Sequence, residues 1–245
     1  MHDKLAISKY LSEVFRDWRG SRNAFPANTY SDSHCPPWPI PFFRNPAAAI
    51  VATVGVNPSS GEFRCGRNWN TVRTPVDWKR RLKNYFNQST PPHEWFESWR
   101  VGLAVLGLSY EDGTAAHFDV SYRPTKAMLK NKTTNPQEFR RMVEQDVAWF
   151  FRLLPLCPNL RLLLTLGPIV CANGSRESLA QFLRNHAPQN GFKVSQDGKF
   201  WVFKHLDTGK TVCVHEISSP GEKCVTCRVV KNLHANRNEL RRRLS

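Results

Sequence analysis

The segment Gly55-Val56-Asn57-Pro58 constrains the fold most, because it closes an apolar run over residues 47–54. A run of this length, followed by turn-forming residues, is typical of a buried strand. Glycine and proline then turn the chain out of the sheet and leave Asn57 at the carboxyl end of the strand. Open α/β sheets bind their ligands at such strand ends, where an amide offers one acceptor and two donors. A strand-ending turn without chemistry is the alternative.

The rest of the chain alternates between strand-like and helix-like patterns. Further core strands are predicted at residues 116–121, 160–166 and 211–214. Asp197-Gly198 and the turn 207–210 indicate antiparallel hairpins within 192–215, ahead of that final core strand. Apolar residues at helical spacing, with Ser175 as an N-cap in one case, predict helices at 3–19, 75–87, 92–106, 136–154, 175–186 and 223–243.

This order predicts one α/β domain over residues 1–245. We expect a three-layer α/β/α sandwich around a central, mostly parallel four-stranded sheet, with a short antiparallel hairpin in addition. Its parts are an amino-terminal helix and Pro-rich wrap (1–46), the core (47–222) and a basic carboxyl-terminal helix (223–245).

The formal net charge of +15 is concentrated in three segments. Residues 64–83 carry seven basic side chains against one acidic, residues 121–141 six against one, and residues 223–245 seven against one. A basic face around the mouth of a crevice is the electrostatic footprint of a polyanion binder. Three solvated helix faces are the alternative. The total and the placement of the charge favour nucleic acid as the partner.

Other classes of protein are disfavoured. No apolar run reaches the length of a membrane span, and the amino end indicates an amphipathic helix rather than a signal peptide. We therefore expect an intracellular protein, in the cytoplasm, nucleoid or nucleus. The seven irregularly spaced cysteines fit a reducing compartment. The pair Cys224 and Cys227 has metal-ligand spacing but no second pair to complete a site, so no metal is expected. Without a P-loop or a Gly-x-Gly-x-x-Gly motif, a kinase or a dehydrogenase is disfavoured.

Four predicted strands end in polar, turn-forming sequence, and these ends carry a resemblance. Gly55-Val56-Asn57-Pro58, Arg123-Pro124-Thr125, the strand 162–167 and the segment 215–220 are similar, in this order, to motifs of the uracil-DNA glycosylase superfamily. The nearest branches are the mismatch-specific and the single-strand-selective ones. The resemblance covers residues 50–222, most of the chain.

The resemblance implies a monofunctional DNA glycosylase. Such an enzyme flips a damaged or deaminated base out of single- or double-stranded DNA and hydrolyses its N-glycosidic bond. Asn57 would position the attacking water, and His215 would hydrogen-bond the base as it departs as an anion. A histidine at a strand end is otherwise often a structural hydrogen-bonding group. The expectation is a monomer that needs neither metal nor cofactor.

The same resemblance points to residues that bind the base and the DNA. An aromatic residue about a dozen positions after Asn57 would stack on the base; that spacing indicates Trp69, with Phe63 as second choice and ordinary loop packing as the alternative. The other base-binding candidates are Gly55, Val56, Pro58, His117 and Asp119. The DNA-binding candidates are Ser59, Ser60, Arg64, Arg67, Arg123, Lys126, Ser218, Ser219 and Lys223.

The chain departs from the family pattern in two places. Asp119 stands where relatives carry an amide or a lysine. An ionised carboxylate accepts a ring N–H but repels a carbonyl of uracil, so the substrate is expected not to be plain uracil alone, or Asp119 to be protonated. His117 shares its strand face with Asp119 and either orients it or simply packs. In the second motif, Glu216-Ile217 replaces Pro-Ser and no large apolar residue follows Pro220, which favours activity on single strands.

Two further functions compete with the glycosylase. A non-catalytic nucleic-acid-binding protein would keep the fold and the basic face without the chemistry. A hydrolase of nucleotides or other small molecules would not need so wide a basic field. The presence of both Asn57 and His215 favours catalysis.

Overall fold

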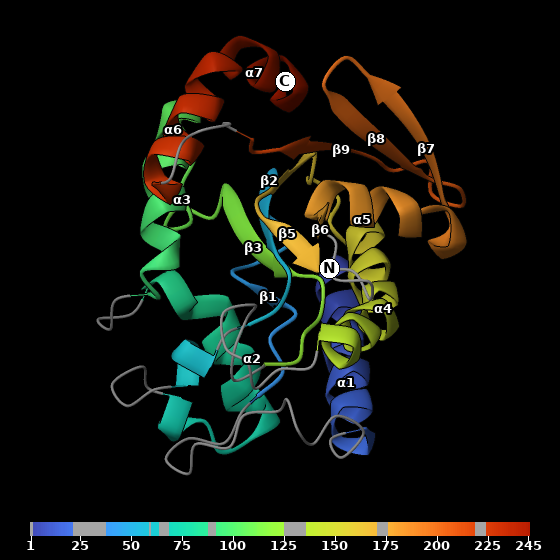
Figure 1. The fold of residues 1–245 in the computed structure, drawn as a ribbon. Coiled ribbons are helices and arrows are strands. Elements are labelled where there is room, and N and C mark those ends of the chain that lie inside the picture. Colours follow the sequence, from blue (N-terminus) through green and yellow to red (C-terminus); the bar gives the residue numbers. More distant parts are fainter. Residues whose placement is uncertain are drawn as a thin grey trace.

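The protein has a mixed α/β architecture, in which helices pack around a seven-stranded sheet (Figure 1). The computed structural model describes residues 2–21, 38–58, 60–63, 69–87, 92–124, 136–170, 176–218 and 224–245. In spatial order, the strands are β1 (Phe42–Phe43), β3 (Ala115–Asp119), β2 (Val51–Gly55), β4 (Leu162–Thr165), β9 (Thr211–Glu216), β8 (Phe200–His205) and β7 (Phe192–Asp197). A separate two-stranded ribbon consists of β5 (Pro168–Val170) and β6 (Arg176–Ser178).

The seven α-helices in the described part of the chain lie on both sides of this sheet. They are α1 (His2–Gly20), α2 (Pro75–Asn84), α3 (Trp95–Leu106), α4 (Pro136–Leu153), α5 (Leu179–His186), α6 (Val225–Ala235) and α7 (Arg237–Leu244). None of these described helices combines the length and the apolar character that a membrane span requires.

The middle of the sheet is parallel. The strand β2 pairs in parallel with β3 on one side and with β4 on the other, and β4 pairs in parallel with β9. The carboxyl ends of these four strands therefore meet at one edge. The predicted strand at 47–54 is β2, which begins at Val51 because the chain turns at 46–48.

The predicted hairpin is not a separate element. The strands β7 and β8 join the main sheet, because β8 pairs antiparallel with β9 from Trp201 opposite Val214 to Lys204 opposite Thr211. At the other edge, β1 pairs antiparallel with β3 and was not predicted. The expectation of four sheet strands plus a hairpin is thus corrected to a single sheet of seven, whose added strands occupy the hydrogen-bonding edges of the parallel part.

Most predicted helices are confirmed to within a few residues, and two are corrected. The predicted helix 175–186 begins at Leu179, where the Ser178 hydroxyl caps it by accepting from the Gln181 N–H at 3.1 Å. Ser175 lies outside the described residues. The predicted helix 223–243 is two helices, α6 and α7, because Asn236 leaves the helical conformation at φ −107° and ψ 11°.

The two faces of the sheet pack against different helices. His117 of β3 contacts the rings of Trp95 and Phe96 in α3, whereas the next residue, Phe118, contacts Phe150 in α4. Because successive side chains of a strand point to opposite faces, α3 and α4 cover opposite faces of the sheet. Figure 1 shows α6 running alongside α3. Residues 53, 117, 164 and 215 are level with one another and face α3 and α6.

The helices α3 and α6 approach closely because small residues line their contact. A Cβ placed on Gly102 would lie 2.4 Å from Cγ1 of Val229, nearer than atoms in contact can come. One turn away, the hydroxyls of Ser98 and Thr226 form a hydrogen bond of 2.8 Å. This contact holds α6, and with it Asn232, over the sheet.

Gly102→Ala tests how far the fold depends on this approach. The added methyl should lower the free energy of unfolding by about 1–2 kcal/mol, because overpacking outweighs the better helix propensity of alanine. In a Val229→Ala background, the same substitution should be neutral or stabilising, since the obstructing methyl is gone. Urea unfolding of the four proteins measures both effects. Equal effects in the two backgrounds would show that Val229 does not limit the approach.

Candidate functional site

Asn57 lies at the carboxyl edge of the central strand, in a turn that is held against the end of β3. The backbone N–H groups of Val120 and Ser121 donate to the carbonyls of Gly55 and Val56 at 3.0 and 2.8 Å. This ladder extends beyond the two strands and places the turn 56–58 beside residues 120–123.

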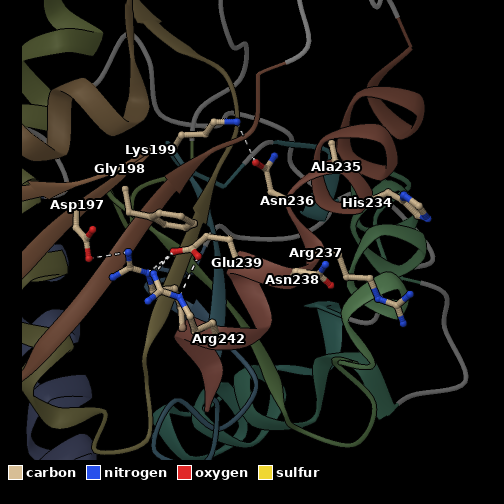
Figure 2. A pocket seen from close by; sticks show the side chains of 12 residues that line it. Asp197, Gly198, Lys199, His234, Ala235, Asn236, Arg237, Asn238, Glu239 and Arg242 are labelled. Atoms are coloured by element: carbon tan, nitrogen blue, oxygen red, sulfur yellow. Dashed lines mark hydrogen bonds and ion pairs between the residues drawn. The ribbon is translucent and has the colours of Figure 1, made fainter.

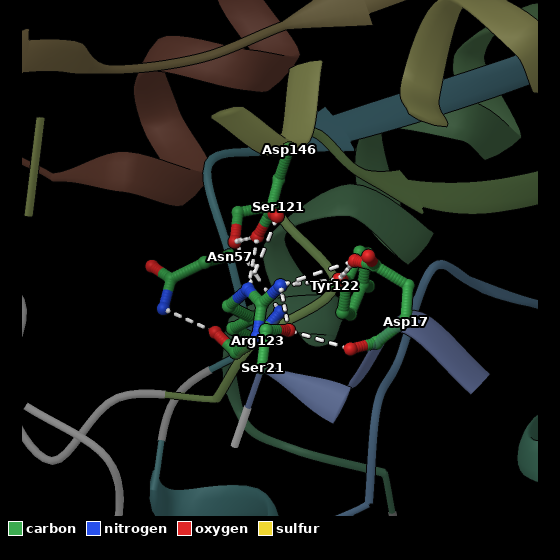
Figure 3. A network of polar contacts seen from close by, with 7 residues as sticks. All are labelled: Asp17, Ser21, Asn57, Ser121, Tyr122, Arg123 and Asp146. Carbon is green, nitrogen blue, oxygen red and sulfur yellow. Dashed lines mark hydrogen bonds and ion pairs between the residues drawn. The ribbon is translucent and has the colours of Figure 1, made fainter. Parts of the chain in front are cut away.

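The Asn57 side chain is buried and fixed in orientation. It is 5% exposed, and its Nδ2 donates to the backbone carbonyls of Pro58 and Arg123, each at 3.1 Å. Figure 3 shows the side-chain oxygen turned away from the polar network around Arg123. The site therefore holds an amide whose donor end is engaged by backbone and whose carbonyl end points elsewhere.

Gly55 brings Asp119 and His117 close to this turn. Gly55 and Asp119 are register partners at the ends of β2 and β3. A Cβ on Gly55 would lie 2.8 Å from Asp119 Oδ1 and 3.1 Å from His117 Cε1. Any larger residue at position 55 would therefore displace these two side chains. The structure thus brings together three predicted residues, Gly55, His117 and Asp119, and Asn57 lies in the turn that follows Gly55.

His117 both packs and orients Asp119. Its Nε2 lies 3.3 Å from Asp119 Oδ1, and its ring contacts aromatic rings of α3. Its Nδ1 lies 3.0 Å from the Thr53 hydroxyl, which lies 2.6 Å from the Tyr110 hydroxyl. All four side chains of this chain of hydrogen bonds are buried.

One direction of donation satisfies every member of the chain. Tyr110 donates to Thr53, Thr53 donates to Nδ1 of His117, and Nε2–H donates to the Asp119 carboxylate. Burial raises the pKa of Tyr110, which keeps its proton and can serve as the first donor. Burial also raises the pKa of Asp119, and His117 opposes that rise. Asp119 can therefore carry a proton more readily than an exposed aspartate, as one of the two expectations for this residue requires.

Arg123 does not lie where a phosphate could reach it, which corrects its predicted role in DNA binding. The side chain is 4% exposed. Its Nε donates to both carboxylate oxygens of Asp146 at 3.1 and 3.0 Å, and its Nη2 contacts Asp17 at 3.2 Å and Ser21 at 2.8 Å (Figure 3). The guanidinium joins the end of β3 to α1 and α4, while the backbone carbonyl of the same residue holds Asn57.

Asp146, the ion-pair partner of Arg123, was not among the predicted site residues, although the sequence carried a signal for it. It interrupts the apolar stripe of α4 at helical spacing between Val143 and Phe150, so its carboxylate had to be buried. Burial raises the pKa of Asp146 to about 6, against the opposing effects of Arg123 and of the Ser121 hydroxyl, which donates to it at 2.6 Å.

Trp69 and Phe63 form part of the core, which argues against the predicted stacking on a base and favours the packing alternative. Each is 1% exposed, and their ring centroids lie 5.1 Å apart. Trp69 also lies against Phe43 and beneath the Arg81 guanidinium, at 6.4 and 5.5 Å. Val56 and Pro58, in the turn itself, are buried as well.

His215 belongs to a separate cluster. It is 3% exposed, and its Nε2 lies 2.8 Å from Oδ1 of Asn232, whose Nδ2 donates to the Ser218 carbonyl at 2.7 Å. This orientation of the amide makes Nε2 the protonated nitrogen. Burial lowers the pKa of His215, so the neutral ring presents a lone pair at Nδ1. That geometry argues against donation to an anionic base and favours an effect on the backbone at Ser218 through Asn232.

Several predicted DNA-binding residues lie outside the described residues: Ser59, Arg64, Arg67, Lys126, Ser219 and Lys223. Ser60 begins a 3-10 turn, Ser60–Phe63. Ser218 is exposed at the sheet edge beyond β9. Cys224 caps α6 by accepting from the Cys227 N–H at 3.5 Å, and no group of three or more His, Cys, Asp or Glu residues in the described ranges is placed to hold a metal ion.

Neither a scan against protein-family models nor a search of curated proteins finds a match to this chain. The site itself therefore supports a function: it holds an oriented amide in the turn after β2 and, at the end of the neighbouring strand β3, a buried carboxyl hydrogen-bonded to a histidine.

Arg123→Met tests the network beneath the site. Loss of the cation leaves Asp146 buried without its charge partner, which should cost about 3–5 kcal/mol of unfolding free energy at neutral pH. Without the cation, the folded-state pKa of Asp146 rises further above its unfolded value near 3.8. The folded variant then holds the proton more tightly, so its deficit should shrink as the pH falls.

Urea unfolding at about pH 7.5 and about pH 5 measures this dependence. The double variant Arg123→Met/Asp146→Leu is the control, because it removes both charges and should recover much of the loss. A deficit in the single variant that does not change with pH would contradict the assigned role of Asp146.

Proposed function

We propose that this chain is a monofunctional DNA glycosylase, on the three-layer α/β/α arrangement expected from the sequence. The observation that carries the proposal is the buried Asn57 amide, fixed by backbone carbonyls in the turn after Gly55, whose register partner Asp119 is hydrogen-bonded to His117 at the same edge of the sheet. A damaged or deaminated base would be flipped from the DNA into this edge.

The reaction is hydrolysis of the bond between the base and C1′ of its sugar. The carbonyl oxygen of Asn57 accepts a hydrogen bond from a water and holds it for attack on C1′. As the bond to the base breaks, its electron pair leaves with the base, and the water oxygen bonds to C1′. One proton of the water ends on the base. The amide contributes by position, which its two backbone hydrogen bonds secure.

Asp119 reads the base in this proposal. One of its oxygens is engaged by His117, and the carboxyl meets the base with the remaining oxygen. Ionised, it accepts from a ring N–H or an amino group; protonated, it also donates to a carbonyl. The raised pKa of Asp119 supports the use of both forms. We therefore propose a substrate other than plain uracil, or one beyond it.

His215 acts as a positioning residue here rather than on the base. Its hydrogen bond to Asn232 secures the amide that holds the carbonyl of Ser218. In this way it sets the backbone that follows β9, where a DNA phosphate could approach the N–H groups.

The second candidate is a nucleic-acid-binding protein without catalysis. The burial of His215, Trp69 and Phe63 favours it, because a glycosylase of the expected kind would use these side chains on the base. The positive charge supports both candidates equally, so a measurement of base release has to decide between them.

Asn57→Ala is the first test of catalysis. Oligonucleotides with uracil, hypoxanthine, xanthine or an oxidised pyrimidine, single- and double-stranded, would be incubated with protein and cleaved with alkali at abasic sites. We expect release of at least one base by the wild type, and a loss in rate of about 100-fold or more in the variant, because the water is no longer positioned.

The control is Asn87→Ala, an exposed asparagine in the 3-10 turn after α2. It should release base at the wild-type rate. If the wild type binds DNA in a salt-sensitive manner but releases none of these bases, the binding protein replaces the glycosylase as the better conclusion.

Asp119→Asn tests the reading of the base. An amide offers a donor and an acceptor at every pH. In the variant, the rate of uracil release relative to release of the preferred base should therefore rise by about 10-fold or more. The pH dependence of the preference, measured by competition between two lesions, should also flatten. Uracil release equal to that of the wild type, with an unchanged preference, would exclude a discriminating role for Asp119.

A further inference from the structure

A cleft of about 670 Å³ separates the β7–β8 turn from the corner between α6 and α7 (Figure 2). The turn consists of Gly198 and Lys199, and Gly198 has φ +60°, which the first position of such a two-residue turn requires. Lys199 therefore stands at the tip. Its Nζ reaches Asn236 Oδ1, at the helix corner, at 3.4 Å.

Ion pairs hold the two walls of the cleft together. Arg243 of α7 binds Asp197 of β7 at 2.7 Å and Glu239 at 2.9 Å, and Arg242 binds Glu239 at 2.7 Å. The guanidinium of Arg243 also lies 4.9 Å from the centre of the Phe200 ring. Both carboxylates that line the cleft are thus neutralised by arginines of α7.

Two exposed cations remain, one on each wall. Lys199 has a neutral amide as its contact, and Arg237 opens α7 on the opposite wall. Within the described ranges, neither side chain forms an ion pair. The cleft therefore has an excess of positive charge that its own acidic residues do not balance, which matches an anionic ligand.

The cleft lies at the same edge of the sheet as Asn57. Because β8 runs antiparallel to β9, the β7–β8 turn lies where β9 ends, and β9 is parallel to β2. Phe200 lines the cleft and lies 5.0 Å from the His215 ring. A polymer with one unit at the end of β2 would cross the ends of β4 and β9 to reach this cleft.

We propose that this cleft binds the phosphodiester backbone of the nucleic-acid strand whose nucleotide occupies the edge at Asn57. Lys199 and Arg237 would contact phosphates from opposite walls, the lysine as a point charge and the arginine through its planar fork. The proposal rests on the proposed function only in taking that strand to be DNA. Phe200 is 2% exposed and offers no ring for a base, so the cleft reads backbone and not sequence.

The test is the salt dependence of binding to a lesion-free, fluorescein-labelled single-stranded oligonucleotide, followed by anisotropy. The variant is Lys199→Gln/Arg237→Gln. The control is Lys193→Gln/Lys204→Gln, which removes two exposed charges from the same hairpin at the opposite end from the turn. All four side chains are exposed, and thermal unfolding checks that each protein is folded.

We expect the slope of log K against log salt to become shallower by about 1.4 in the cleft variant, or about 0.7 for each lost phosphate contact on a single strand. Affinity at about 0.1 M salt should fall roughly 10-fold, while the control changes less than about 2-fold. Equal losses in the two variants, or an unchanged slope in the cleft variant, would overturn the proposal. The proposal would also be overturned if the wild type bound a polyglutamate peptide more tightly than the oligonucleotide, and if only the cleft variant lost that binding. That result would assign the cleft to an acidic protein.

Base release under the same conditions separates this proposal from the proposed function. If both hold, the cleft variant keeps kcat and raises KM. Release by the wild type without a cleft-specific change of slope supports the glycosylase and rejects the cleft. A cleft-specific change of slope in a protein that releases no base supports the cleft and rejects the glycosylase.

Discussion

The ion pair between Arg123 and Asp146 is the interaction on which the candidate site depends. It crosses from the end of β3 to the middle of α4, and the same guanidinium reaches Asp17 in α1. Three elements far apart in the sequence therefore meet at one side chain. The backbone of that residue in turn supplies the carbonyl that orients Asn57. A buried ion pair adds little net stability over an apolar packing of the same volume, but the loss of one partner leaves a buried charge without compensation. Here the pair holds Arg123 in place, and the carbonyl of Arg123 accepts from Asn57 in the turn after the central strand.

Much of the fold follows from local pattern. Apolar runs predicted β2 and β4 well, and apolar stripes predicted α1 and α4. In buried strands and amphipathic helices, the spacing of apolar residues shows directly which face is buried. The short strand β1 carried no such signal: two residues, Phe42 and Phe43, pair with β3 only because the sheet has a free edge there. The break at Asn236 also carried no signal in the sequence. The apolar residues of α6 and α7 have the spacing of a single helix, which hides the break between them.

The site was predictable in its position and less so in its roles. The positions of Asn57 and Asp119 at neighbouring strand ends were predictable, because alternating strands and helices form a parallel sheet whose carboxyl ends meet at one edge. Arg123 and Trp69 were assigned from the family resemblance, by motif and by spacing after Asn57, as a phosphate contact and a stacking ring. Whether such a side chain faces solvent depends on partners distant in the sequence, here Asp146 for the one and Phe63 with Arg81 for the other. Asn232, which controls His215, lies on a helix and belongs to no motif.

The chain of hydrogen bonds from Tyr110 to Asp119 ends inside the protein. Its inner member is fully buried and keeps its own proton, so the core side neither supplies a proton to Asp119 nor takes one from it. Asp119 therefore exchanges its proton on the side of Gly55, its register partner at the end of β2. A ligand bound on that side would block the exchange and hold the charge of the carboxyl for as long as it stays. The site would then sort its occupants by the protonation state that each one meets on arrival, as well as by shape.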